Sequence, residues 1–260
     1  MNEYLLYLLI IGAGFLAGFI NMLAGSGSIV TLPLLIFAGL PANVANGTNR
    51  IAILLQNVVG SANFKKQNVL NTKQGLWLAI PTTIGSLVGA QIAVSINEDA
   101  MEKVIAGLLI FMFFVILYKP NQWVQGKAVH SEKKPSIIQI IIFFFIGIYG
   151  GFIQAGVGLF LLAGLVLNVG ADLVKANALK VFIILLYTPF AFLIFVFNNQ
   201  VDYKLGLILA IGNMLGAFVG SKVAVSWGPK FVRIVLLFVI VISALKLLGF
   251  FEFLKNVMSP

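Results

Sequence analysis

Cysteine is absent from this 260-residue chain, and histidine occurs only once, at His130. The absence of cysteine excludes disulfides, thiolate metal ligands and any transport chemistry that depends on a thiol. His130 stands in a polar stretch between apolar segments, which excludes a histidine metal site or proton relay inside those segments. No catalytic dyad or triad is evident either. The sequence therefore predicts a protein that is not an enzyme and that has no metal site and no cofactor.

Charged residues are scarce too, at 10% of the chain, whereas a typical soluble domain has about 25%. Hydrophobic residues make up 60%, and apolar runs of about 20 residues recur, each long enough to cross a bilayer. This pattern predicts an all-α polytopic membrane protein. The net charge of +9 fits basic loops on the cytoplasmic side of a membrane, so the expected partner is the lipid bilayer and not a nucleic acid.

The apolar segments form two groups of five, separated by a polar linker. The first group covers 4–23, 28–40, 47–64, 75–96 and 101–118, and the second covers 136–154, 158–169, 178–197, 205–226 and 230–250. We expect a single integrated membrane domain made of repeat one (1–118), the linker (119–135) and repeat two (136–260). Because segments 28–40 and 158–169 are short for a full crossing, they are interpreted as half-helices that follow a glycine break.

The two groups resemble each other at a constant spacing, which indicates an internal duplication. A shift of 131 positions superposes Gly25 on Gly156, Gly27 on Gly158, Asn46 on Asn177, Lys73 on Lys204, Gly75 on Gly206, Gly85 on Gly216 and Gly89 on Gly220. Slightly earlier, Gly14 and Gly18 match Gly147 and Gly151 at a shift of 133. The result is a prediction of two homologous repeats of about four to five membrane segments each.

The distribution of lysine between loops predicts that these repeats are inverted. Lysines gather before segment 75–96 in repeat one, but after the equivalent segment 205–226 in repeat two. Because positively charged loops stay in the cytoplasm, equivalent loops lie on opposite sides of the membrane and both termini lie outside. Lys246 and Lys255, near the C-terminus, do not fit this orientation.

Glycines break the backbone at corresponding places in the two repeats, around Gly25-Ser26-Gly27-Ser28 and Gly156-Val157-Gly158. Paired breaks of this kind are the best pointer in a sequence to a transport site. A helix that begins after each break presents free N–H groups and the positive end of its dipole, and glycine lets an anion approach closely. We predict substrate-binding roles for Gly25, Ser26, Gly27, Ser28, Gly156 and Gly158. The alternative is that these glycines only let helices pack closely, and that reading is preferred for Gly85, Gly89, Gly216 and Gly220.

A second candidate set opens the third segment of each repeat. Arg50 and Lys180 are cations in the predicted first turns of segments 47–64 and 178–197, beside Asn46 and Asn177. A cation there opposes the helix dipole and is costly in a membrane, and an anionic substrate would relieve both penalties. The alternative is that these long side chains snorkel to the interface. Thr48 and Asn49 are further candidate donors to the anion.

Polar residues inside the apolar segments complete the predicted site. Asn21 and Gln154 match at a shift of 133, directly before the two breaks, and could cap the half-helices or contact the ligand. Gln56 and Tyr187 match at 131 and could line the same cavity. No acidic residue lies clearly inside an apolar segment, so no proton or sodium site built on a buried carboxylate is evident.

The motifs "GFLAGFINMLAGSGSIVTLPLL", "ANVANGTN" and "GSLVGA", echoed by "GGFIQAGVGLFLLAGL", "VKANALK" and "GNMLGAFVGS", resemble those of the sulfite exporter TauE/SafE family of bacterial membrane anion transporters. The resemblance covers nearly the whole chain. It implies a multi-pass, two-repeat protein of the bacterial cytoplasmic (inner) membrane that transports sulfite, organosulfonates or related small anions without a cofactor. Ala178-Leu179 replaces Gly47-Thr48 in the second repeat, so a ligand contact from Thr48 would be asymmetric.

These observations predict a secondary transporter of small anions, with a sulfite or sulfonate substrate, that works by alternating access between the repeats. An anion channel and a transporter of small carboxylates that uses the same site remain alternatives. A homodimer is an open possibility for its assembly.

Overall fold

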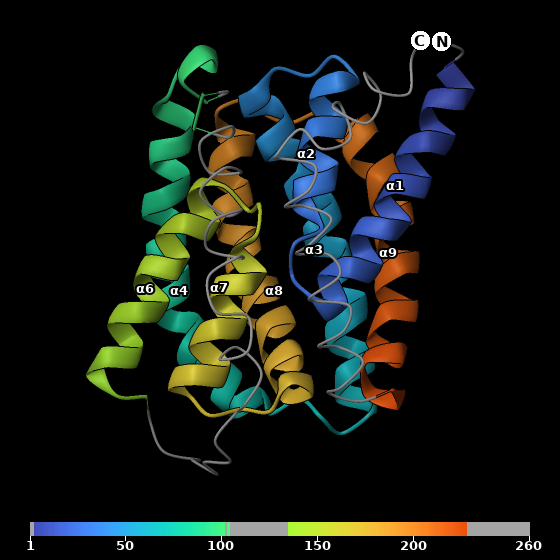
Figure 1. Cartoon of the computed structure of the whole chain (residues 1–260). Coiled ribbons are helices and arrows are strands. Elements are labelled where there is room, and N and C mark those ends of the chain that lie inside the picture. Colours follow the sequence, from blue (N-terminus) through green and yellow to red (C-terminus); the bar gives the residue numbers. More distant parts are fainter. Residues whose placement is uncertain (1–2, 102, 105–134, 228–260) are drawn as a thin grey trace, which may run out of the picture.

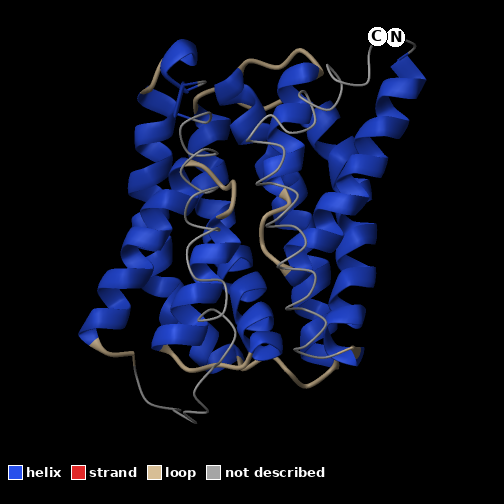
Figure 2. Ribbon diagram, viewed as in Figure 1, coloured by secondary structure: helices blue, strands red, loops and turns tan. Residues whose placement is uncertain are grey.

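The computed structural model describes residues 3–101, 103–104 and 135–227, and throughout these ranges the regular structure is helical (Figures 1 and 2). His130, segment 230–250, and nearly all of segment 101–118 and the linker lie outside the described residues. The helices are α1 (Glu3–Leu23), α2 (Ser28–Phe37), α3 (Ala42–Lys66), α4 (Thr72–Ser95), α6 (Ile137–Phe152), α7 (Val157–Ala163), the π-helical η1 (Gly164–Asn168), α8 (Leu173–Phe197) and α9 (Tyr203–Ser226).

Helices α1, α4, α8 and α9 are long and apolar enough to cross a membrane. Large apolar side chains stay exposed on the outer faces of the bundle, among them Leu16, Ile84, Phe145 and Leu215. Such a surface suits lipid tails and not water. The all-α polytopic membrane fold predicted from the sequence is confirmed.

The two short segments are half-helices. Helix α2 has 10 residues and α7 has 7, so at 1.5 Å per residue neither spans the roughly 30 Å hydrocarbon core of a bilayer. Both begin near the middle of the molecule and run toward opposite ends (Figure 1). The backbone turns directly before them at Gly25 and Gly156, which have φ of +74° and +73°, a conformation that glycine adopts without strain.

The described helices α6, α7, α8 and α9 run opposite to α1, α2, α3 and α4, which hold the matching places in the first half of the sequence. In Figure 1, α1, α3 and α9 descend, whereas α4, α6 and α8 rise. This opposed course is what inverted repeats require, while the inversion relative to a membrane stays a prediction.

The first helix of each repeat packs against the other repeat. Helix α1 packs along α9 of the other repeat, and α6 packs along α4. Glycines make this contact close, since a Cβ at Gly89 would lie 1.9 Å from the carbonyl oxygen of Ile148, and one at Gly216 would lie 2.0 Å from that of Phe15. The packing role predicted for these helix glycines is confirmed.

The same contacts correct the predicted register of the first helices. Gly18 faces Asn213 and Gly147 faces Thr82, and these two partners stand 131 positions apart. The counterpart of Gly18 is therefore Gly147, at a shift of 129, and not Gly151, at 133. The error of four residues is about one helical turn, which returns to the same face of the helix.

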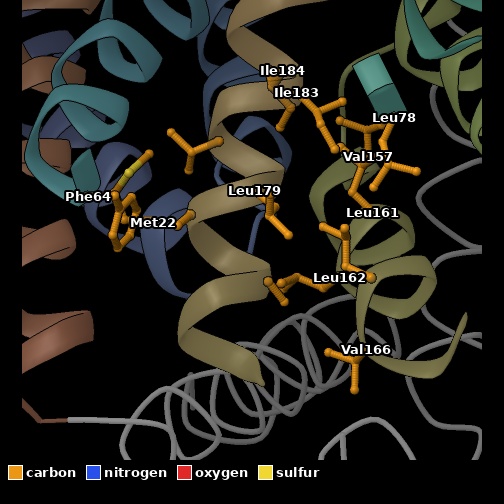
Figure 3. Packing of buried hydrophobic residues seen from close by; sticks show 14 of the residues in the cluster. Met22, Phe64, Leu78, Val157, Leu161, Leu162, Val166, Leu179, Ile183 and Ile184 are labelled. Atoms are coloured by element: carbon orange, nitrogen blue, oxygen red, sulfur yellow. The ribbon is translucent and has the colours of Figure 1, made fainter. Parts of the chain in front are cut away.

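Apolar side chains hold the half-helix α7 against the long helix α8. Figure 3 shows Leu179 and Ile183 of α8 turned toward Val157 and Leu161, with Met22 on the other side of α8. The end of α1 and the start of α7 are thus packed on the same helix, close to the two breaks.

Helices α3 and α8 begin earlier than predicted, at Ala42 and Leu173 instead of residues 47 and 178. Pro41 precedes the first of them with φ of −53°, and the Asp172 carboxylate accepts hydrogen bonds from the N–H groups of residues 174 and 175 to cap the second. The prediction that Arg50 and Lys180 lie in first turns is therefore wrong.

We expect Gly18→Val to lower the unfolding temperature of the purified protein, because its Cβ would lie 2.2 Å from the Asn213 carbonyl oxygen and push α1 off α9. The expected loss is about 1–3 kcal/mol, the usual cost of overpacking. At Gly12, on the same helix, a Cβ would have no atom within 4 Å. Gly12→Val is therefore the matched control, and equal unfolding temperatures for the two variants would contradict the close packing.

Candidate functional site

The two backbone breaks touch each other in the middle of the molecule. A Cβ at Gly25 would lie 2.5 Å from the Cα of Gly158, and a Cβ at Gly158 would lie 2.4 Å from the Cα of Gly25. No side chain fits at either position. The starts of α2 and α7 therefore meet, in the arrangement that paired glycine breaks predict.

Asn21 caps the half-helix α2. Its side-chain oxygen accepts a hydrogen bond of 2.6 Å from the N–H of Gly27, the residue that precedes the helix, and its amide nitrogen donates to Gln56 at 3.3 Å. From α3, Asn49 donates to the hydroxyl of Ser28 and accepts from the hydroxyl of Thr31. The start of α2 is thus held by side chains of both α1 and α3.

Lys180 and Asn177 bind the carbonyl groups at the end of α1. The Lys180 ammonium donates to the carbonyl oxygen of Asn21 at 2.7 Å and to the side-chain oxygen of Asn177 at 2.5 Å. The Asn177 amide donates to the carbonyl oxygen of Leu23 at 3.2 Å. The Asn21 carbonyl also accepts a hydrogen bond of 3.1 Å from the N–H of Gly25, and the end of a helix dipole favours a cation.

Arg50 and Asn46 bind the carbonyl groups at the end of α6, in the other repeat. The Arg50 guanidinium donates to the carbonyl oxygens of Gly151 at 2.6 Å and Gly150 at 3.4 Å, and Asn46 donates to that of Phe152 at 2.8 Å. The guanidinium also lies 4.3 Å from the ring centre of Phe195. Both cations therefore lie at the C-terminal ends of helices in the opposite repeat, where the dipole attracts them instead of repelling them.

The paired caps also locate the two-residue insertion by which the second repeat differs from the first. Asn177 donates to the carbonyl oxygen of Leu23, and its counterpart Asn46 donates to that of Phe152, so Leu23 and Phe152 hold equivalent places. Leu23 stands two positions before Gly25, whereas Phe152 stands four positions before Gly156. Gln154 lies within this insertion, so the predicted equivalence of Asn21 and Gln154 is wrong.

Arg50 and Lys180 are fully buried. In the described part of the chain, the ion pairs are Lys175 with Asp172 and Lys204 with Glu3, all of them well exposed. Neither buried cation has a carboxylate partner there. A buried charge with only neutral partners is expensive, and inside a membrane it marks a candidate functional site.

A small cavity adjoins Lys180 and the first glycine break. Its volume is about 10 Å³, room for about one water molecule. The residues that line it come from both repeats: Asn21, Gly25, Ser28, Ile53, Gln56, Asn57, Gln154, Val157, Lys180 and Ile184.

The structure brings six of the predicted site residues together around this cavity: Asn21, Gly25, Ser28, Gln56, Gln154 and Lys180. Three others, Ser26, Gly27 and Gly156, belong to the adjacent broken backbone, and Gly158 lies in the first turn of α7. Asn177 is bonded to Lys180, and Asn49 is bonded to Ser28.

The remaining four predicted residues lie away from the cavity. Arg50 and Asn46 surround the end of α6, and the Tyr187 hydroxyl lies against Gly150 there. The Thr48 hydroxyl accepts a hydrogen bond of 2.8 Å from the N–H of Asp202, which fixes the loop before α9.

Sequence reasoning left Asn57 out of the predicted site, although it lines the cavity. The signal was its place beside Gln56, between the apolar residues 51–55 and 58–59 of α3. The apolar lining residues Ile53, Val157 and Ile184 carry no such signal, because apolar residues are everywhere in this chain.

Comparison with known proteins agrees with the architecture. The family model "Sulfite exporter TauE/SafE" matches residues 10–247. The chain is similar to the probable membrane transporter protein ORF9 of a Sinorhizobium species, at 31% identity over 237 residues, 91% of this chain and 90% of that protein. It is also similar to a probable membrane transporter protein of Haemophilus influenzae, at 26% identity over 85% of this chain and 86% of the relative.

A third relative is the probable membrane transporter protein YfcA of Escherichia coli, at 28% identity over 90% of this chain and 86% of that protein. No solved structure matches the chain. A family match over this length, on a polytopic helical fold, identifies a membrane transporter and not an enzyme. The chain belongs to the sulfite exporter TauE/SafE family.

Proposed function

We propose that this membrane transporter is a secondary transporter of small oxyanions, with sulfite or a sulfonate as substrate, that works by alternating access in the bacterial cytoplasmic membrane. The observation that carries the proposal is Lys180, a fully buried ammonium at the cavity beside the glycine breaks. Its charge has no carboxylate partner among residues 3–101, 103–104 and 135–227.

The contacts of Lys180 suit an anionic ligand. An ammonium has three N–H donors, and two of them have the acceptors already described, the Asn21 carbonyl and the Asn177 side chain. Both acceptors are neutral, so an anionic oxygen would form a stronger, charge-assisted bond. The hydroxyl of Ser28 also lines the cavity and can donate to the same anion.

Arg50 holds the corresponding place in the other repeat. It is as deeply buried as Lys180, and its Nε–H makes no hydrogen bond within the described part of the chain. We assign Arg50, with Asn46 and Tyr187, to the same binding site. These residues would contact the anion in the second state of the transport cycle, when the site opens to the opposite side of the membrane. Two related cation sites at one centre fit a transporter that rocks between two openings.

The size of the cavity favours alternating access over an open channel. Space for about one water molecule is too small for an oxyanion, so the lining must separate before the anion enters. The lining comes from both repeats, which means that movement of one repeat against the other would open it. The opposed directions of equivalent helices support the inverted repeat that such a movement needs (Figure 1).

Sulfite is expected to raise the unfolding temperature of the purified protein, because a ligand that binds the folded state stabilises it. In Lys180→Met, its affinity should fall about tenfold or more, since a hydrogen bond to a charged group contributes about 1.5–3 kcal/mol. Lys180→Arg, which retains the charge, should keep part of the affinity.

The matched control is Lys175→Met. Lys175 lies on the same helix, about half exposed and paired with Asp172. Acetate and chloride test the alternative of a carboxylate or a simple halide. Equal sulfite affinity in Lys180→Met and Lys175→Met would reject Lys180 as a ligand and the proposed site with it.

The charges at the two ends of the bundle predict its orientation. Lys65 and Lys66 end α3, Lys73 and Lys175 lie in the first turns of α4 and α8, and Lys222 lies near the end of α9. These helix ends are at the lower end of the bundle in Figure 1, whereas α9 begins at the upper end, with Lys204 in its first turn. By the positive-inside rule the lower end is cytoplasmic.

Because the natural chain has no cysteine, single cysteines can report this topology directly. Lys66→Cys and Lys222→Cys should react with an impermeant thiol reagent from the cytoplasmic side, and Lys204→Cys from the outer side. Reaction of Lys66→Cys and Lys222→Cys from opposite sides would contradict the inverted repeat.

A further inference from the structure

We infer that the anion bound at the Lys180 cavity is a monoanion that also carries its own O–H or N–H donor. The inference rests on the proposed function and narrows its substrate class. Asn57 and Gln154 line the same cavity as Lys180, and their buried side-chain oxygens have no hydrogen-bond partner in the described part of the chain.

The orientation of the Asn57 amide is fixed by its neighbour. Its nitrogen donates to the carbonyl oxygen of Ile53 at 2.6 Å. Because that carbonyl can only accept, the NH₂ group must face it, and the oxygen is the free end of the amide. Asn57 is 1% exposed, so bulk water does not solvate this oxygen.

Gln154 presents the second acceptor from the other repeat. Its amide nitrogen donates to the hydroxyl of Thr188 at 3.1 Å, and its oxygen has no partner. Gln154 is 2% exposed. It lies in the two-residue insertion, so this acceptor exists only at the end of α6 and has no counterpart at the end of α1.

Gln56, another amide at the cavity, has a side-chain oxygen that is already bonded. The side-chain oxygen of Gln56 accepts from Asn21 at 3.3 Å and from Asn213 at 3.1 Å. Its hydrogen bonds hold α1, α3 and α9 together and leave that oxygen satisfied. The free acceptors are therefore a property of Asn57 and Gln154 and not of every amide around the cavity.

One cation with two free acceptors matches a ligand with one negative charge and at least one donor hydrogen, which bonds to one of the two amide oxygens or is shared between them. A fully deprotonated anion without a donor would meet Lys180 but would leave both amide oxygens buried and unbonded, which is a costly arrangement. Sites built to bond a ligand hydroxyl discriminate strongly against the analogue that lacks it. Hydrogensulfite and hydroxyl-bearing sulfonates are monoanions that carry such a donor, whereas the sulfite dianion and sulfate do not.

The test compares 2-hydroxyethanesulfonate with ethanesulfonate, which have the same charge and nearly the same size but differ in one hydroxyl group. Affinities are measured on the purified full chain by isothermal titration. We expect the hydroxylated sulfonate to bind at least tenfold more tightly to the wild type. In Asn57→Leu and in Gln154→Leu this preference should fall severalfold while ethanesulfonate affinity changes little.

Asn43→Leu is the matched control on α3, because among the described residues the Asn43 side chain bonds only to its neighbour, accepting from the N–H of Val44. It should keep the full preference. Equal binding of the two sulfonates to the wild type would overturn this inference, would mean that water satisfies the two oxygens, and would leave the proposed function standing. An unchanged preference in both amide variants would overturn it as well. If neither sulfonate nor any other oxyanion binds, the proposed function and this inference are both overturned.

Discussion

The C-terminal carbonyl groups of α1 and α6 end inside the molecule, at a depth where a membrane protein has no water to bond them, and the centre of the structure is organised around this constraint. Each helix end is bonded by an asparagine and a cation from a long helix of the opposite repeat, Asn177 with Lys180 of α8 and Asn46 with Arg50 of α3. The caps permit two chain breaks at the centre. The breaks in turn allow the half-helices to begin there.

The same cations serve the fold and the proposed site, and this dual role gives substrate binding a route to conformational change. Lys180 bonds to the carbonyl of Asn21, whose side chain caps α2. An anion that draws the ammonium toward itself weakens the hold on the end of α1 and, through it, on the start of α2. Binding energy would thus act on the junction between the repeats, where a population shift needs a difference in affinity between two states.

Much of the fold was predictable from the sequence because composition and glycine spacing are local signals: the polytopic helical class, the two half-helices and their meeting at the breaks. The helix starts were missed because Pro41 and Asp172 determine them, and neither belongs to the apolar pattern. The partners of Arg50 and Lys180 were missed for another reason. They are backbone carbonyls 100 to 159 positions away in the chain, and a carbonyl carries no sequence signature.

The packing of each first helix against the other repeat has a consequence for biosynthesis. Helix α1 is synthesised about 180 residues before α9, the helix along which it packs. At roughly 5–20 residues per second, that interval lasts about ten to forty seconds. Until α9 has been made, the glycine face of α1 has no helix to pack against, so this contact forms late in the assembly of the bundle.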